Sequence, residues 1–164
     1  MKIHIPKKFK ILKKVKLSEK NLIDFEKKIF DLYSQGKIKF SIHLSGGNEK
    51  ILIKIFSFIS KNDWVFSSWR NHYHALLHGM DKNKLEKQII NGKSMYISSK
   101  KNKFFCSSIA GGSLPIALGV AKSIKLKKQK NKVWVFIGDM TSEMGIFYEV
   151  YKYARYNNLP IEFV

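Results

Sequence analysis

Apolar residues in the first part of this chain recur every three or four positions, a spacing that predicts amphipathic helices. Residues 18–35 give the clearest example, because Ser18 can cap the start of a helix and Gly36 can end it. The side of this helix that faces the core would consist of Leu22, Phe25, Ile29 and Tyr33.

The rest of the pattern predicts further helices and alternating strands. After a turn at 40–50, helices are expected at 51–60, 72–79, 81–92, 114–125 and 145–158, strands at 64–69, 132–138 and 159–164, and a loop at 93–107. The core-facing side of the helix at 145–158 would consist of Phe147, Val150, Tyr151 and Ala154. Because the apolar run at 132–138 is almost unbroken, as in a strand covered on both faces, the predicted fold is α/β, with a parallel sheet flanked by helices.

Lysine dominates the charge of the chain. The formal net charge is +19, and all but two of the 31 basic residues are lysines. Specific nucleic-acid sites favour arginine, whereas these lysines are spread over almost every segment, so we favour compositional drift over nucleic-acid binding. The lysine-rich runs at 7–16 and 125–132 could still attract polyanions without specificity.

The length of 164 residues fits one domain, which we place at 18–164, preceded by a basic N-terminal arm at 1–17. No apolar run reaches the ~20 residues that a membrane span needs. The N-terminus lacks the apolar core of a signal peptide, and Cys106 is the single cysteine. These features are typical of a cytoplasmic protein without disulfides.

Gly138 and Asp139 stand at the end of the buried strand at 132–138. In open α/β sheets, ligands bind beyond the carboxyl ends of the strands. The glycine permits a sharp turn, and the carboxylate is a suitable ligand for a hard cation such as Mg²⁺. This tip is therefore a candidate site for a metal and a diphosphate.

Four motifs across 40–164 occur together in a known order. They are "IHLSGGNE", "SSWRNHYHALLHG", "SSIAGGSLPIALGVA" and "GDMTSEMGIFYE" followed by "YARYNNLPIEFV". In this order they resemble the alpha subunit of the thiamine-diphosphate-dependent 2-oxo acid dehydrogenases, the first components of the pyruvate, branched-chain and acetoin dehydrogenases. The last motif is similar to the Gly-Asp-Gly metal motif of that family, and the resemblance implies a thiamine-diphosphate-binding fold.

The resemblance also implies roles for individual residues. Asp139 would ligate Mg²⁺, and Arg70 would pair with phosphate oxygens of thiamine diphosphate, for which arginine suits better than lysine. Trp69 replaces the family's tyrosine and would pack on the cofactor or in the core, and His72 matches a histidine close to the cofactor mouth. Backbone contacts to the cofactor would come from Ser108, Ala110, Met140 and Thr141.

Several other polar residues have a structural explanation. We expect His43 and Glu49 to be architectural, and His74 and His78 to be surface or satisfied core histidines. No motif makes Cys106 a nucleophile, so it is expected to be a small packing residue.

Two departures from the family pattern bear on activity. Met140 replaces the second glycine of the metal motif, and a positive φ there would cost about 1 kcal/mol or more. The family's second metal ligand lies about thirty residues after the aspartate, beyond Val164. Asn157 and Asn158 precede the last strand and so lie at its wrong end; we interpret them as a helix-ending pair. The expectation is therefore a thiamine-diphosphate-binding domain that is incomplete at its C-terminus.

The resemblance implies oxidative decarboxylation of a 2-oxo acid, with thiamine diphosphate and Mg²⁺ as cofactors. A beta subunit and a second alpha subunit would be partners in a heterotetramer, and a lipoyl-bearing acyltransferase would be a further partner. The residue that activates the cofactor would come from the beta subunit, so no catalytic base is assigned to this chain.

Two alternatives stay open. The chain could be a non-catalytic remnant or interaction module with the same fold, or, as the weaker alternative, a basic nucleic-acid-binding protein. The sequence does not indicate which 2-oxo acid would be the substrate.

Overall fold

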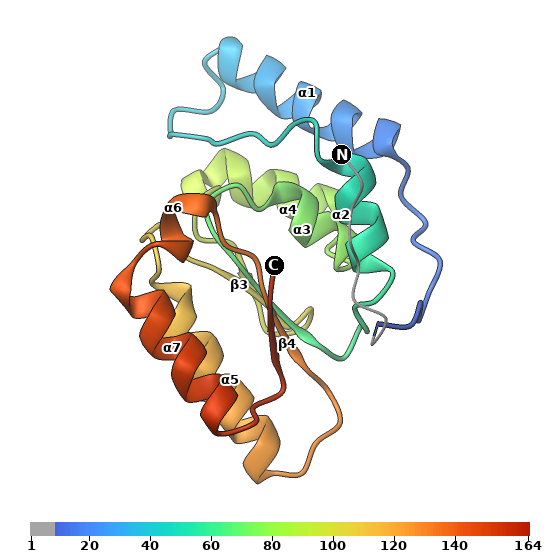
Figure 1. Cartoon of the computed structure of the whole chain (residues 1–164). Helices are drawn as coiled ribbons and strands as arrows, with labels where there is room; N and C mark the ends of the chain where they lie inside the picture. Colours follow the sequence, from blue (N-terminus) through green and yellow to red (C-terminus); the bar gives the residue numbers. More distant parts are fainter. Residues whose placement is uncertain (1–8) are drawn as a thin grey trace.

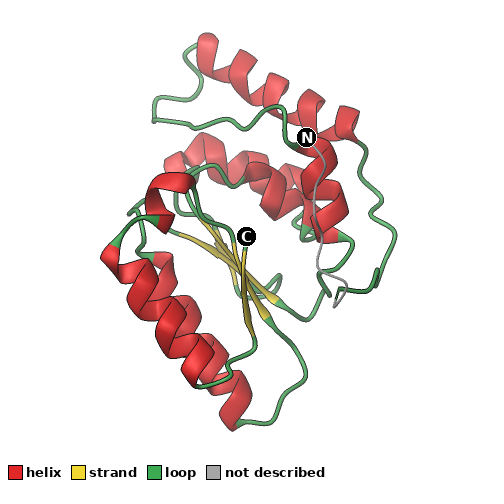
Figure 2. Ribbon diagram, viewed as in Figure 1, coloured by secondary structure: helices red, strands yellow, loops and turns green. Residues whose placement is uncertain are grey.

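The computed structural model describes residues 9–164, which form one sheet with helices on both faces (Figures 1 and 2). The order β2-β3-β1-β4-β5 has β2 antiparallel to β3, and all other neighbours are parallel. The predicted α/β fold with a parallel sheet flanked by helices is confirmed.

The elements are α1 (Glu19–Ser34), α2 (Glu49–Phe56), β1 (Trp64–Ser67), α3 (His72–Leu77), α4 (Lys82–Gln88), the turn η1 (Ile89–Lys93), β2 (Ser98–Ser99), β3 (Phe104–Cys106), α5 (Ser113–Leu126), β4 (Val133–Val135), α6 (Asp139–Ser142), α7 (Gly145–Tyr156) and β5 (Ile161–Phe163).

Alternate side chains of the central strands enter two different apolar clusters. Val65 of β1 and Trp134 of β4 belong to the cluster formed with helices α1 to α4. Phe66 and Val135, their neighbours in sequence, belong to the cluster formed with α5 and α7. Figure 1 shows the same division, with α5 and α7 on one side of the sheet and α1 to α4 on the other. The unbroken apolar run of β4 is therefore explained by burial on both faces.

Helix α1 begins and ends, and helix α7 ends, at the residues predicted to cap them. Ser18 Oγ accepts from the Asn21 amide (3.3 Å) and Asn21 Oδ1 accepts from the Ser18 amide (2.9 Å), which forms a reciprocal cap on α1. Gly36 has φ +70° and ends that helix. Asn157 caps α7 and Asn158 follows with φ +46°, which confirms their interpretation as a helix-ending pair.

Two tyrosines predicted to face the core do not. Tyr33 is 45% exposed, because Leu32 rather than Tyr33 follows Ile29 along the apolar stripe of α1. Tyr151 is 42% exposed, and its ring lies at the rim of the second cluster, 5.9 Å from the ring centroid of Phe163. The other predicted face residues of α1, and Val150 and Ala154 of α7, are buried.

The prediction of a loop at 93–107 is wrong for two short stretches, because β2 and β3 lie there, with β3 between β2 and β1 in the sheet. Phe104 pairs with Val65, and both Phe104 and Cys106 are 1% exposed. β3 has three residues and β2 has two, so neither is long enough to show a periodic pattern. Burial raises the pKa of the Cys106 thiol to about 12, in agreement with its predicted packing role.

Part of the predicted basic arm lies against the domain. Residues 1–8 are outside the described residues. From residue 9, the Leu12 and Lys13 amides donate to the Ser57 carbonyl (2.9 and 3.3 Å), and Phe9 packs on Phe58 and Trp134. The division of the chain at residue 17 stays a prediction. Within residues 9–164, every helix falls short of the length and apolar character that crossing a bilayer requires.

Two histidines are part of the core, as expected, although the Nδ1 atom of His78 has no hydrogen-bond partner among the described residues. His74 shares a 2.7 Å hydrogen bond with the Ser67 hydroxyl, and His78 Nε2 donates to the Asp63 carbonyl (3.1 Å). Burial lowers the pKa of His74 to about 3 and that of His78 to about 4, since a charged imidazolium would be desolvated there. Both rings are therefore neutral in the folded protein near pH 7.

The place of β3 in the core can be tested by truncating a side chain. Phe104→Ala is expected to lower the free energy of unfolding by about 3–5 kcal/mol, because it leaves a cavity in a fully buried site. Tyr96→Ala is the control from the same predicted loop, since Tyr96 is 52% exposed, and its effect should stay within about 1 kcal/mol. Urea unfolding measures both; equal losses would contradict the assignment of β3.

The buried histidines predict a pH dependence of stability. In the unfolded chain they titrate near pH 6.5, whereas in the folded chain they stay neutral down to about pH 4. As the pH falls below about 6.5, the unfolded state binds protons that the folded state does not, so the free energy of unfolding falls by about 1.4 kcal/mol per pH unit for each proton. Urea titrations between pH 7 and pH 5 measure this slope. His74→Gln should reduce the slope by about one proton, and an unchanged slope would contradict this account.

Candidate functional site

The carboxyl ends of three parallel strands meet at one edge of the sheet. Ser67 of β1 is in register with Cys106 of β3, and Phe66 of β1 with Val135 of β4. The segments that follow these strands carry all the residues predicted to contact a cofactor. Parallel pairing therefore gathers the candidate site from segments far apart in sequence.

Arg70 follows the end of β1 and is exposed, while Trp69 is half-buried. Arg70 Nη1 donates to the Leu44 carbonyl, and the Trp69 ring centroid lies 6.1 Å from that of His43. The next residue, Asn71, is fully buried, and its amide donates to the carbonyls of Trp69 (3.0 Å) and Ser94 (2.8 Å). This buried side chain fixes the backbone from which Arg70 projects.

The loop at 43–47, whose Leu44 carbonyl accepts the hydrogen bond from Arg70, is held in place by two buried carboxylates. Glu26 Oε2 accepts from the Ser45 amide (2.7 Å), and Glu49 Oε1 accepts from the Gly47 amide (3.2 Å) and the Tyr73 hydroxyl (3.1 Å). Burial, together with the two nearby carboxylates, raises the pKa of the Tyr73 hydroxyl, which stays protonated as a donor. The architectural role predicted for Glu49 is confirmed.

Ser108 and Ala110 are exposed in the turn at 107–112, between β3 and α5. The Ile109 amide donates to the Ser107 hydroxyl (3.1 Å), and Gly111 has φ +73°. A Cβ on Gly111 would lie 2.8 Å from Ile146 Cγ2, so the turn packs directly against the start of α7. Glycine is therefore required here both for its conformation and for the close approach.

Asp139 is exposed at the tip of β4, where α6 begins. One carboxylate oxygen, Oδ1, accepts from the Met140 amide (2.8 Å). In the described part of the chain, no ion pair involves this carboxylate. Sequence analysis did not anticipate α6, a helix of four residues that turns the chain immediately after the aspartate.

Met140 and Thr141, the two residues after Asp139, differ in the exposure of their side chains. Met140 is 77% exposed, whereas the Thr141 side chain is buried. Met140 lies within α6 and is not among the described residues with positive φ, so the backbone cost considered for replacing glycine at this position does not arise. The long methionine side chain instead extends into solvent beside the candidate site.

His72 lies beneath the site and is 0% exposed. Its Nδ1 lies 3.2 Å from Glu26 Oε1 and its Nε2 lies 2.9 Å from Ser94 Oγ, so both ring nitrogens have partners inside the protein. Direct contact between His72 and a bound cofactor stays a prediction. The structure shows that His72 connects Glu26 of α1 to Ser94, and the Ser94 carbonyl also accepts from the side-chain amide of Asn71.

Glu26 was missed by sequence analysis although it contacts two of the segments that form the site. It is 4% exposed and binds both His72 and the backbone of the loop at 43–47. A signal was present, because Glu26 lies between Leu22 and Ile29 on the apolar stripe of α1. An acidic residue on such a stripe indicates a buried carboxylate that needs partners.

Asp139 is an exposed carboxylate at this edge that a metal could bind. Within residues 9–164, no three His, Cys, Asp or Glu side chains come together as a metal site. The carboxylate oxygens of Asp139, with Arg70 after the adjacent strand β1, fit one part of a metal–diphosphate site, and any further ligands would come from outside these side chains.

Comparison with known proteins shows which family the chain resembles. The Dehydrogenase E1 component family matches residues 18–164. The alpha subunit of acetoin:2,6-dichlorophenolindophenol oxidoreductase from Bacillus subtilis is 30% identical over 85% of this chain and 45% of its own length. The pyruvate dehydrogenase E1 component alpha subunit from Rickettsia typhi is 28% identical over 97% of this chain and 53% of its own. The chloroplastic alpha-3 subunit of the pyruvate dehydrogenase E1 component from Arabidopsis thaliana is 31% identical over 85% of this chain and 36% of its own length.

The chain spans about half the length of the first two of these relatives. The match nevertheless includes every segment at the sheet edge described above. With its thiamine-diphosphate-dependent fold, the chain belongs to the Dehydrogenase E1 component family.

Proposed function

We propose that this chain forms the diphosphate-binding side of a thiamine-diphosphate-dependent 2-oxo acid dehydrogenase, as part of its alpha subunit. The observation that carries the proposal is the position of Asp139, an exposed carboxylate at the same sheet edge as Arg70 and the turn at 107–112. The reaction would be the oxidative decarboxylation of a 2-oxo acid.

In this proposal, Asp139 binds Mg²⁺ and Arg70 pairs with phosphate oxygens. Trp69 packs against the cofactor with the exposed part of its ring. His72 supports Arg70 from below through the buried contacts of Glu26 and Ser94. The backbone groups that contact the cofactor belong to Ser108, Ala110, Met140 and Thr141.

When bound, thiamine diphosphate supplies the electron sink for decarboxylation. The residues of this chain bind and orient the diphosphate, which fixes the position of the reacting ring. We assign no proton transfer to them. The beta subunit would complete the site, in a heterotetramer with a second alpha subunit, and a lipoyl-bearing acyltransferase would accept the product.

One observation favours a second candidate function, a non-catalytic module with this fold. Among residues 9–164, Asp139 has no group of ligating side chains around it. Calorimetric titration with thiamine diphosphate and Mg²⁺, with and without a candidate beta subunit, separates the two functions. Heat of binding in either arm supports the proposal; no heat in both arms would support the non-catalytic module.

The metal-binding role of Asp139 predicts a large effect of Asp139→Asn. We expect the affinity for thiamine diphosphate in the presence of Mg²⁺ to fall about 100-fold or more, because loss of even an outer partner of a metal ligand costs about 10–100-fold. Glu143→Gln, an exposed carboxylate at the end of the same short helix, is the matched control and should change the affinity less than about threefold. A similar loss in both variants would mean that general charge, rather than metal ligation, is responsible.

Arg70→Lys tests the phosphate contact while it keeps the charge. The affinity for thiamine diphosphate should fall about tenfold, since a lysine cannot form the two parallel hydrogen bonds of a guanidinium. Arg155→Lys changes the only other arginine, which is exposed on α7, and should leave the affinity unchanged. If Arg70→Lys binds as tightly as the original chain, Arg70 does not contact the diphosphate.

A further inference from the structure

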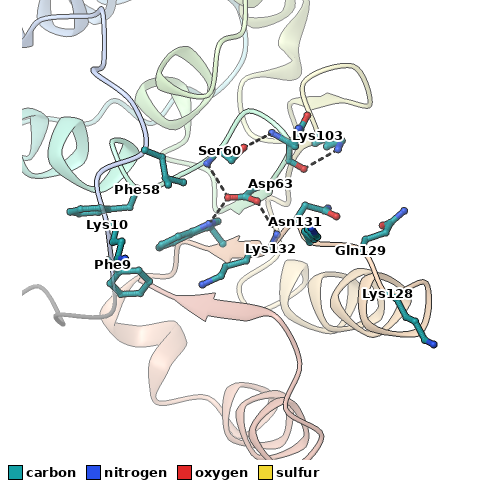
Figure 3. A pocket seen from close by; sticks show the side chains of 14 residues that line it. Phe9, Lys10, Phe58, Ser60, Asp63, Lys103, Lys128, Gln129, Asn131 and Lys132 are labelled. Carbon is teal, nitrogen blue, oxygen red and sulfur yellow. Dashed lines mark hydrogen bonds between the residues drawn. The ribbon is translucent and has the colours of Figure 1, made fainter.

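A cavity of about 720 Å³ opens at the opposite edge of the sheet, where the parallel strands begin (Figure 3). Asp63 precedes β1, Lys103 precedes β3 and Lys132 precedes β4, and all three line the cavity. Phe9 and Phe58 form an apolar wall on one side. This cavity is separate from Asp139, which lies at the carboxyl ends of the same strands.

Positive charge is concentrated around this cavity. Five of its 14 lining residues are lysines, whereas 29 of the 164 residues of the chain are. This share is about twice that of the whole chain, and three of the five lysines belong to the lysine-rich run at 125–132. The lining lysines are Lys10, Lys103, Lys128, Lys130 and Lys132.

The single acidic residue of the lining is already bound to the protein. Asp63 Oδ1 accepts from the Lys132 amide (2.8 Å), and Oδ2 accepts from the Ser60 amide (2.9 Å) and from Trp134 Nε1 (3.1 Å). Figure 3 shows these bonds converging on the carboxylate. Asp63 is 5% exposed, so its charge stabilises the wall of the cavity and is not presented at the mouth.

Three of the lysines have ammonium groups available for a ligand. Lys103 Nζ donates to the Asn62 carbonyl (2.9 Å), and Lys132 Nζ lies 3.4 Å from Glu162. Lys10, Lys128 and Lys130 are exposed, and in the described part of the chain they form no ion pair. Flexible lysine side chains at a rim can close around an anion.

The backbone supplies an independent observation. Lys103 has φ +51° and Lys128 has φ +52°, and they are two of the three non-glycine residues with positive φ in the described chain. Glycine or asparagine would adopt this conformation at lower cost. Lysine therefore stands at two positions that favour other residues, and both positions line the cavity.

We propose that this cavity binds a small anion that carries two or more linked phosphate groups. Ammonium groups are effective point-charge partners of phosphate, and the volume suits a ligand of this size. Inorganic tripolyphosphate and a nucleoside triphosphate share the required chemistry. The proposal does not depend on the function of the Asp139 edge, because no residue is common to the two sites.

Calorimetric titration of the full chain with inorganic tripolyphosphate at ~0.15 M salt tests the proposal. The variant Lys10→Ser/Lys128→Ser/Lys130→Ser is expected to bind at least about tenfold more weakly than the original chain. Its matched control, Lys20→Ser/Lys27→Ser/Lys39→Ser, removes the same charge from exposed lysines elsewhere and should lose less than about threefold. Absence of binding to the original chain, or equal losses in both triple variants, would overturn the proposal.

Parallel titrations with ATP and AMP identify the source of the phosphates. Equal affinities for ATP and tripolyphosphate would support recognition of the phosphate chain alone, and tighter binding of ATP would support a nucleotide. Binding of AMP as tight as that of ATP would contradict recognition of linked phosphates.

A second measurement needs no variant. Lysine acetylation of the original chain, followed by mass spectrometry, should show that tripolyphosphate protects Lys10, Lys128 and Lys130 but leaves Lys20, Lys27 and Lys39 reactive. Protection spread evenly over both sets would overturn the proposal, whether or not the triple variants fold.

Discussion

Parallel pairing of β1 with both β3 and β4 is the constraint on which the rest of this molecule depends. It brings Ser67, Cys106 and Val135 to one edge of the sheet, so that the segments after them lie together. The same pairing brings the starts of the strands to the other edge, where Asp63 binds the Lys132 backbone. Two chemically different regions therefore arise from one sheet, one centred on a carboxylate and the other on lysines.

The site edge depends in turn on polar groups buried beneath it. Glu26 connects α1 to His72 and to the Ser45 backbone, and His72 connects to Ser94. Ser94 also accepts from Asn71, the residue after Arg70. Because a buried charged or polar group without partners is costly, these contacts constrain one another, and together they hold the backbone that presents Arg70.

Sequence reasoning recovered the long elements because periodicity and caps are local signals. The 16-residue α1, with its cap at Ser18, and the buried β4 could be predicted for that reason. β3 could not, because three residues carry no period and its place is set by pairing with β1, which is far away in sequence. The motifs located the exposed Asp139 and Arg70, but they could not reveal that His72 is fully buried, which is set by its contacts with Glu26 and Ser94.

The hydrogen bond from Arg70 to the Leu44 carbonyl has a consequence for the loop at 43–47. An anion that draws the guanidinium away would remove that tie and leave the loop anchored through the Ser45 and Gly47 amides to Glu26 and Glu49. Binding of an anion at the Asp139 edge would then affect the loop at 43–47 without direct contact between the loop and the anion. Through this one hydrogen bond, binding of an anion by Arg70 would change how firmly the loop at 43–47 is held.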